Sequence, residues 1–400
     1  MPGAHAILSP SASKRWMECP PSARREALLP EESSPYAVEG SLAHRIAEVM
    51  LTAYRDLDLL PMTSDDLLQV EDGTVAADLR QLQQECSEAG LDYDSIAGTV
   101  HDGYVLLVYE EYQAFRRADK DTRLLVEARL NLRSFIPEGF GSSDAVIIGN
   151  DTVSVYDLKF GKGVKVDAVN NPQMMIYALG AVYGPADDYV VHDIRMTIVQ
   201  PRLAWYSRFE TTFEGLTHWG KYTLRPAAAK AFEGAGEYRP GAHCRFCRVA
   251  PSCRVCEAYS RALRETCQDV SDLRDDELGY VLSQLDVLRG WATKVETRAM
   301  DLLQQGKPVG GWKLVEGRSV RKISDQDAAI ERLKAAGIDL DTVLKAPELK
   351  GLTDLEKVLR KSGLQTILGD LITKPQGKPT LAREDDPRPA MTPDVSKDFE

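Results

Sequence analysis

The sequence has few cysteines outside one short segment, and it lacks a long apolar run. Of its seven cysteines, four fall within HCRFCRVAPSCRVC, residues 243–256. No stretch is long and apolar enough to span a bilayer, and the N-terminal MPGAHAILSPSASKRW has no apolar core typical of a secretory signal. We therefore expect a cytoplasmic protein without membrane association, in which clustered cysteines bind a metal more often than they form disulfides.

Basic residues are too few to balance the acids, which leaves a net charge of −12. This charge argues against a protein that is wrapped generally in nucleic acid. A local basic surface is compatible with it, because residues 239–264 contain six arginines and one acid. Those arginines either solvate a loop or face the phosphates of a partner, and charge alone favours neither.

The apolar pattern predicts an α/β fold with the order helix, three strands, helix, strand, followed by a helical segment before the cysteines. The expected helices cover residues 37–54, 101–118, 171–184 and 212–234, and the expected strands cover residues 123–132, 144–149, 152–160 and 189–201.

We expect three regions along the chain and no internal repeat. Residues 1–260 form the main domain. Residues 261–373 form a smaller α+β region with a long helix over 272–305 and a hairpin over 310–323. Residues 374–400 are rich in proline and charge and poor in apolar groups, which predicts a disordered tail.

Two predicted strand ends carry acids that can act together. Asp157 and Lys159 are two residues apart, so both side chains project from one face of their strand, while Leu158 faces the core. If this strand pairs with the preceding one through the short turn GNDT, Asp144 comes alongside Asp157. Two facing carboxylates repel unless a cation lies between them, and oxygen ligands suit Mg²⁺ or Mn²⁺. A lysine beside such an ion can orient a water or stabilise charge on a phosphate.

Other polar residues surround this pair in the predicted arrangement. Glu127 lies on the preceding strand as an inward or edge acid, and Gln173 and Tyr177 share one face of the following helix. His44, on the first long helix, can supply a nitrogen ligand. Each residue alone has an ordinary interpretation as a turn cap, a solvated strand residue or a helix histidine, so the prediction of a site depends on the combination.

The combination resembles the PD-(D/E)XK nuclease superfamily. The resemblance is carried by GSLAH ending at His44, SSD ending at Asp144, DLK at 157–159 and QMMIY at 173–177. More narrowly, it is similar to the branch that contains the RecB and AddB nuclease domains and the CRISPR-associated iron–sulfur exonucleases. DLKFGKG and NPQMMIYALGA resemble a phage and prophage family of unassigned function in that branch. The resemblance covers roughly residues 8–260 and implies a restriction-endonuclease-like core with an iron–sulfur-stapled helical lobe.

The resemblance also implies a role for each of these residues. The catalytic metal would be held by a histidine, two aspartates and a backbone carbonyl: His44, Asp144, Asp157 and Leu158. Lys159 would position the attacking water, and Gln173 and Tyr177 would contact DNA or hold the site. The role of Glu127 stays open between catalysis and structure.

The cysteines permit two interpretations. Four of them could form a zinc site, but zinc ribbons separate their two C-x-x-C pairs by a longer loop than the one present here. The spacing C-x₂-C-x₅-C instead resembles the iron–sulfur motif of AddB-like nucleases, in which the fourth thiolate comes from near the N-terminus. The resemblance implies a [4Fe–4S] cluster held by Cys19, Cys244, Cys247 and Cys253. Cys256 is then a spare thiol or an alternative ligand, and Zn²⁺ is the alternative occupant of the site. Cys86 and Cys267 are expected to be helix core residues.

Together these observations predict a metal-dependent DNA nuclease, an exonuclease that acts in phage or prophage recombination, replication or repair inside a bacterial host cell. It would hydrolyse phosphodiesters with one or two Mg²⁺ or Mn²⁺ ions. The alternative is a non-catalytic DNA-binding or scaffolding module that retains the nuclease fold. The expected partners are DNA and, through the acidic C-terminal end, a single-strand-binding or recombination protein.

Overall fold

The computed structural model describes most of the chain. The described residues are 6–29, 35–59, 62, 64–67, 70, 73–161, 165–266, 275–316, 322–345, 348–349, 355, 363–364, 366–368, 371–373, 379–383 and 389. The chain divides into two compact units, Met1–Leu288 and Arg289–Glu400. The predicted boundary at residue 260 falls inside the first unit. No helix in the described part of the chain is long and apolar enough to cross a membrane.

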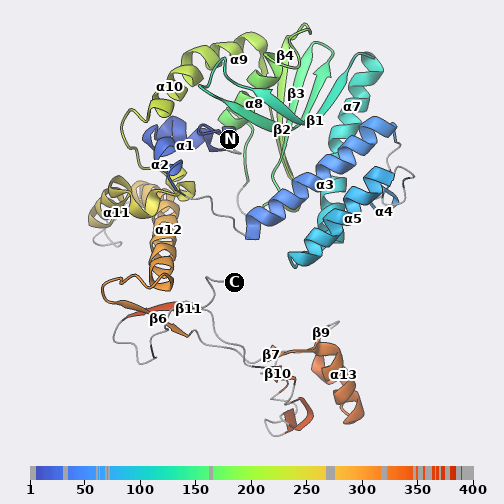
Figure 1. Ribbon diagram of the computed structural model, residues 1–400, viewed down its shortest axis with the longest axis vertical. Coiled ribbons are helices and arrows are strands. Elements are labelled where there is room, and N and C mark those ends of the chain that lie inside the picture. The colour runs from blue at the N-terminus through green and yellow to red at the C-terminus, as the bar shows by residue number, and fades with distance from the viewer. Residues whose placement is uncertain are drawn as a thin grey trace. The chain divides into compact units, whose positions relative to one another are not determined.

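A five-stranded mixed sheet forms the centre of the first unit (Figure 1). Its strands follow chain order across the sheet: β1 (Arg123–Asn131), β2 (Phe140–Gly149), β3 (Thr152–Leu158), β4 (Asp193–Gln200) and β5 (Trp205–Thr212). Strands β1 to β3 form an antiparallel meander, β4 runs parallel to β3, and β5 is antiparallel to β4. The predicted mixed α/β class and the four predicted strands are confirmed, whereas β5 has no counterpart among the predicted strands.

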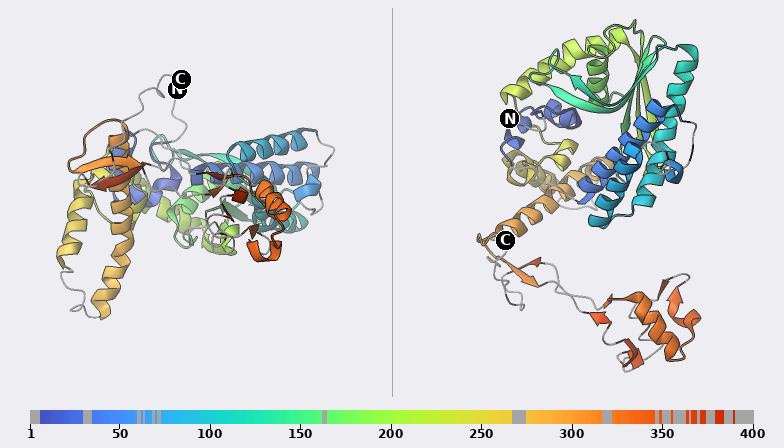
Figure 2. Two further views of the ribbon diagram at one scale, coloured as in Figure 1. Left: turned by 90° about the horizontal axis from the view of Figure 1, so that it is seen from below. Right: turned by 45° about the vertical axis from the view of Figure 1, so that its right-hand side comes forward.

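Helices cover both faces of this sheet. The α-helices up to residue 304 are, in chain order, α1 (Ser13–Glu18), α2 (Pro21–Glu26), α3 (Pro35–Leu57), α4 (Ser64–Leu67), α5 (Gly73–Glu88), α6 (Tyr93–Val100), α7 (Leu106–Ala118), α8 (Pro172–Val182), α9 (Phe213–Trp219), α10 (Arg225–Glu233), α11 (Arg254–Thr266) and α12 (Asp275–Gln304). One apolar cluster packs α8, α9 and α10 against one face, and a second packs α3, α5, α6 and α7 against the other. The right-hand view of Figure 2 shows the blue and cyan helices of the second cluster gathered on one side of the green sheet.

Local sequence signals explain the elements that hold the site. Strand β3 is buried along its whole length, as expected for a central strand that is covered on both faces. Helix α8 supplies the crossover that the parallel pair β3–β4 requires. It starts at Pro172, whose missing N–H costs nothing in a first turn, and Asn171 caps it by accepting a 3.0 Å hydrogen bond from the Gln173 N–H.

The second unit has its own small apolar cluster and several short strands. Its elements after α12 are β6 (Trp312–Glu316), β7 (Lys322–Ile323), α13 (Gln326–Ala335), α14 (Leu340–Val343), β8 (Leu344–Lys345), β9 (Glu348–Leu349), β10 (Ile372–Thr373) and β11 (Pro379–Arg383). The predicted long helix is confirmed as α12.

One prediction for this unit is wrong. The hairpin expected over 310–323 does not form, because β6 pairs with β11 and β7 pairs with β10. The tail expected to be disordered contains β11, in which Leu381 lies opposite the buried Leu314. The composition averaged over residues 374–400 does not reveal this strand, because a short alternating stretch is enough for β11 to pair with β6. Apart from β11 and Pro389, the predicted tail lies outside the described residues.

Candidate metal centre and cysteine cavity

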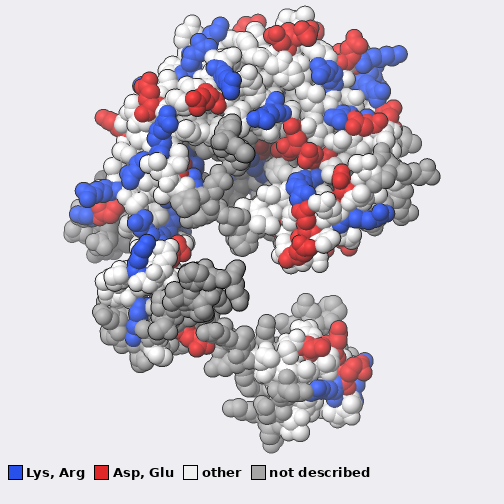
Figure 3. All heavy atoms as spheres, in the orientation of Figure 1, with Lys and Arg blue, Asp and Glu red and all other residues white. Residues whose placement is uncertain are grey.

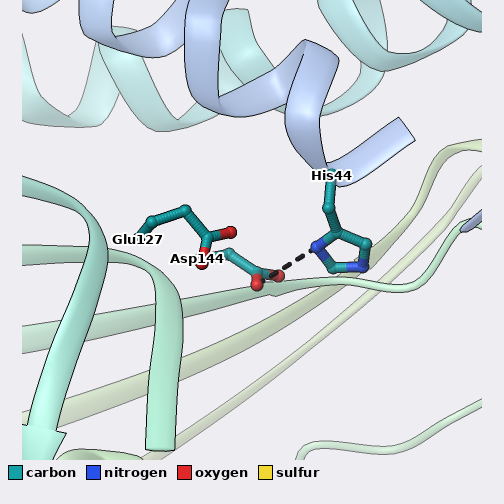
Figure 4. Close-up of side chains that lie close together, drawn as sticks. All are labelled: His44, Glu127 and Asp144. Carbon is teal, nitrogen blue, oxygen red and sulfur yellow. Dashed lines mark ion pairs between the residues drawn. The ribbon is translucent and has the colours of Figure 1, made fainter. Parts of the chain in front are cut away.

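Three potential metal ligands come together from three elements of the first unit: His44 from α3, Glu127 from β1 and Asp144 from β2 (Figure 4). One ligand atom of each lies within 4.8 Å of the others. His44 Nδ1 lies 3.2 Å from Asp144 Oδ1, which is the pair that Figure 4 marks with a dashed line. A nitrogen with two carboxylates is a donor set that divalent ions such as Mn²⁺ accept.

Glu127 has an unusual backbone conformation for a residue in the middle of a strand. Its φ is +45°, in the left-handed region, which costs a residue other than glycine on the order of 1–3 kcal/mol. On either side of it, Val126 pairs with Ala145 and Ala128 pairs with Ser143, so Glu127 stands opposite Asp144. Strain of this kind clusters at functional sites, and here it coincides with two facing acids.

Glu127 and His44 both have raised pKa values, so they hold their protons more strongly than they would in isolation. Burial and the charge of Asp144 raise the pKa of Glu127 to about 7. Burial alone would lower the pKa of His44, but its hydrogen bond and charge interaction with Asp144 raise that pKa overall. A divalent cation would have to displace these protons, so its affinity is expected to rise with pH.

A second group surrounds Asp157, which is only 3% exposed. Lys159 Nζ donates to Asp157 Oδ1 at 3.2 Å and lies 2.9 Å from Oδ2, which has no well-aligned hydrogen bond. Gln173 joins both residues: its Nε2 donates to Asp157 Oδ1 at 2.9 Å, and its Oε1 accepts from Lys159 Nζ at 3.2 Å. Gln173 Nε2 also lies 3.4 Å from the Tyr177 hydroxyl, which accepts from it. The four predicted residues therefore form one connected network.

Charge within this network keeps Lys159 protonated. Burial lowers the pKa of Lys159, but the charge and the hydrogen bond of Asp157, together with the charge of Asp144, outweigh burial and raise the pKa overall. Burial raises the pKa of Asp157, which the charge of Lys159 opposes. Lys159 is thus an ammonium group fixed in position by a carboxylate and an amide, which suits it to face a phosphate.

The backbone of Leu158 links the two groups. Its N–H donates a 2.6 Å hydrogen bond to Asp144 Oδ2, so Asp144 touches both the histidine and the strand that carries Asp157. Among the predicted metal ligands, His44 and Asp144 lie in the three-residue group, whereas Asp157 contacts Lys159 and Gln173 instead. Glu127, whose role the sequence leaves open, takes the third place in that group.

The cysteines line a cavity elsewhere in the first unit. Five thiols surround it, one from the end of α1 and four from residues 244–256: Cys19, Cys244, Cys247, Cys253 and Cys256. All five are free thiols. Cys256, which the resemblance leaves as a spare thiol or an alternative ligand, is 1% exposed and lies against the same cavity.

A partly buried ion pair between Arg15 and Glu26 joins the two distant parts of the chain that line this cavity. Arg15 Nε donates to Glu26 Oε2 at 2.7 Å, and Glu26 Oε1 accepts from the Arg248 N–H, also at 2.7 Å. Arg15 Nη1 donates to the Phe246 carbonyl at 3.0 Å. The N-terminal helices are thereby fastened to the segment that carries Cys244 and Cys247.

Two polar residues of the cavity escape sequence reasoning, because nothing in their local pattern marks them. His243 hydrogen-bonds with Cys19 and Cys244, which raises its pKa to about 10 against the opposing effect of burial. The pKa of Cys244 falls to about 4, first through its hydrogen bond with Cys256 and also through that with His243. Ser22 Oγ also lines the cavity, and this buried hydroxyl has no hydrogen-bond partner among the described residues.

The predicted basic segment is on the surface. The side chains of Arg239, Arg245, Arg248, Arg254 and Arg261 are exposed, and that of Arg264 lies outside the described residues. Figure 3 shows Lys and Arg gathered on the part of the first unit that carries α1, α2 and α11. Cys86 is fully buried in α5, as predicted, and Cys267 lies outside the described residues.

Fold and site together define a mixed α/β protein with a candidate metal centre and a separate thiol-lined cavity. The chain belongs to the family described as "Protein of unknown function (DUF2800)", whose model matches residues 5–389. Among solved structures, one described as "Crystal structure of SSO0001" is similar at 14% sequence identity, with a TM-score of 0.22. That match covers 52% of this chain and 94% of the other.

Proposed function

We propose that this chain is a divalent-metal-dependent nuclease that hydrolyses DNA phosphodiesters, with a restriction-endonuclease-like core of the PD-(D/E)XK type. The observation that carries the proposal is the hydrogen bond from the Leu158 N–H to Asp144, which joins a candidate metal centre to a fixed lysine. Acids, a histidine and a half-buried ammonium group in one place are the parts that phosphodiester hydrolysis needs.

The residues fit such a reaction. His44, Glu127 and Asp144 would hold the ion, and Asp157 stands next to them through its neighbour Leu158. When bound, a divalent cation would polarise the phosphate and stabilise the leaving oxygen. Lys159, held by Asp157 and Gln173, would orient a water toward phosphorus and offset charge on the phosphate. The water oxygen bonds to phosphorus, the bond to the sugar oxygen breaks, and that oxygen takes up a proton.

The cysteine cavity supports a [4Fe–4S] cluster held by Cys19, Cys244, Cys247 and Cys253. The cavity offers five thiols, and four thiolates are the usual ligands of a [4Fe–4S] cluster. The unpartnered Ser22 hydroxyl could donate to a sulfur of such a cluster.

The exonucleolytic mode and a role in phage or prophage recombination, replication or repair follow from the resemblance alone. DNA as the substrate has support from the exposed arginines of residues 239–261, which can contact phosphates on a chain that is otherwise acidic.

End-labelled DNA digestion tests the proposal. The protein, purified without oxygen, is expected to degrade DNA with Mg²⁺ or Mn²⁺ and to stop when the ion is chelated. Asp157→Ala and Lys159→Ala should abolish degradation and leave the circular dichroism spectrum unchanged, whereas Lys334→Ala, in an exposed pair of the second unit, should cut normally. Undiminished cleavage by both site variants would overturn the assignment. Tight DNA binding without cleavage in either ion would favour the non-catalytic binding module.

A further inference from the structure

Tyr104 is a buried tyrosine whose hydroxyl is left without a partner. It is 1% exposed, and its hydroxyl has no hydrogen-bond partner among the described residues. Leaving such a group unpaired costs about 1–3 kcal/mol, so its presence calls for an explanation. Tyr104 lies in a single π-helical turn, His101–Val105, between α6 and α7. Turns of this kind are frequent at functional sites.

Neighbouring tyrosines show that this cluster can satisfy a buried hydroxyl. Tyr54 and Tyr109 belong to the same apolar cluster as Tyr104. The Tyr54 hydroxyl lies 2.9 Å from His101 Nε2, and the Tyr109 hydroxyl donates to the Leu59 carbonyl at 2.9 Å. The unpaired hydroxyl of Tyr104 is therefore a property of its position.

Tyr104 belongs to an apolar cluster that extends to the candidate metal centre. Other members of this cluster are Ala43, Ala145 and Leu158, which are the chain neighbours of His44, Asp144 and Asp157. Burial raises the pKa of Tyr104 well above its usual range, and the charges of Asp144, Asp157 and Glu127 add to the effect, with Asp144 first. The hydroxyl thus lies in the field of all three carboxylates and stays protonated, which makes it a hydrogen-bond donor.

We propose that Tyr104 is a positioning residue of the metal centre, whose hydroxyl donates a hydrogen bond to the Asp144 carboxylate when a divalent cation is bound. The inference rests on the proposed function, in which Asp144 is a metal ligand. Without an ion, Asp144 Oδ1 lies against His44 and Oδ2 accepts from the Leu158 N–H. An ion that takes up His44 and Asp144 ends their direct pairing, so the carboxylate gains room for a new donor. Ligating carboxylates are commonly held by such an outer hydrogen bond.

The test is Mn²⁺ binding by titration calorimetry, without DNA and above the pKa of Glu127. Tyr104→Phe removes only the hydroxyl. We expect it to weaken Mn²⁺ binding by roughly 10–100-fold, the usual effect of losing an outer hydrogen bond to a ligand. The thermal midpoint of the metal-free variant should stay equal or rise, because an unpaired buried hydroxyl has been removed. Equal Mn²⁺ affinity in wild type and Tyr104→Phe would overturn the inference.

Tyr109→Phe is the matched control. It removes the hydrogen bond to the Leu59 carbonyl, so it should lower the thermal midpoint and leave Mn²⁺ affinity unchanged. A wild-type protein that binds no Mn²⁺ would overturn both the metal centre and the role of Tyr104. A wild-type protein that binds Mn²⁺ but cuts no DNA, with weaker binding in Tyr104→Phe, would overturn the nuclease proposal alone.

Discussion

Glu127 stands opposite Asp144 in the antiparallel pair of β1 and β2, so two carboxylates face each other across neighbouring strands. Like charges in directly opposed positions destabilise a strand pair, and the left-handed backbone of Glu127 adds to the cost. A cation between the two carboxylates would offset both costs. Because a cation and a proton compete for Glu127, the protonation state of Glu127 depends on whether the site holds a cation.

Glu127→Gln should reduce the pH dependence of stability. The pKa of Glu127 rises from 4.5 to about 7 on folding, because burial and Asp144 disfavour its charged form. Its protonation therefore stabilises the folded state fully below about pH 4.5, and this contribution is lost as the pH rises through about 7. In thermal unfolding with a chelator present, the midpoint of the wild type should fall over this range more than that of Glu127→Gln. Parallel curves would contradict the assignment.

Mn²⁺ should stabilise the protein more above pH 7 than below it. The ion competes with protons on Glu127 and His44, whose pKa values are both raised. An ion present at a hundred times its dissociation constant stabilises by about 2.7 kcal/mol, enough for a clear rise in the unfolding midpoint. Asp144→Asn should remove most of the rise. A pH-independent shift, or one that persists in Asp144→Asn, would place the ion elsewhere.

Gln173→Leu should destabilise the fold by about 1–3 kcal/mol, since it leaves the buried Asp157 and the half-buried Lys159 without their shared amide. Urea unfolding followed by circular dichroism measures the change. Gln84→Leu is the control, because Gln84 is exposed on α5 and its side-chain amide donates to Glu88, four residues further along the same helix. Its effect should stay within about 0.5 kcal/mol. If both variants lose a similar free energy of unfolding, the hydrogen bonds of Gln173 with Asp157 and Lys159 contribute no more to stability than those of an exposed pair.

The iron and acid-labile sulfide content of purified cysteine variants should distinguish the four predicted cluster ligands from Cys256. Cys19→Ala should lose both, because a [4Fe–4S] cluster needs four thiolates and Cys19 supplies the one from α1. Cys256→Ala should retain iron and sulfide close to wild type. The reverse result would exchange the two residues in the ligand set, and zinc in place of iron in every variant would reject the cluster.

The local spacing of apolar residues predicted the elements that hold the site, because these segments have a clear helical or strand periodicity. Helix α3, strands β1 to β3 and helix α8 all lie where apolar spacing placed them. Strand β5 escaped prediction, since its buried and exposed residues alternate irregularly and it carries charged side chains such as Arg208 and Glu210. The wrong hairpin has a similar cause: the sequence around β6 has the form of a local hairpin, but its partner β11 lies far along the chain.

The site was predictable where its residues sit at short, regular spacing. Asp157 with Lys159, and Gln173 with Tyr177, share one face of a strand and of a helix, and they form one network. The left-handed backbone of Glu127 and the unpaired hydroxyls of Ser22 and Tyr104 have no local signal. They depend on which distant segments pack around them, which no single window of sequence contains.

The hydrogen bonds between the N-terminal helices and residues 246–248 join segments that are synthesised at different times. Arg15 donates to the carbonyl of Phe246, 231 residues further along the chain. At ribosomal rates of 5–20 residues per second, roughly 10–50 s separate the appearance of the two partners. During that interval the newly made Cys19 has no cavity to occupy, so its thiol is exposed to the surroundings of the growing chain. Loading of any inorganic group must therefore come late, after the ribosome has passed Cys253.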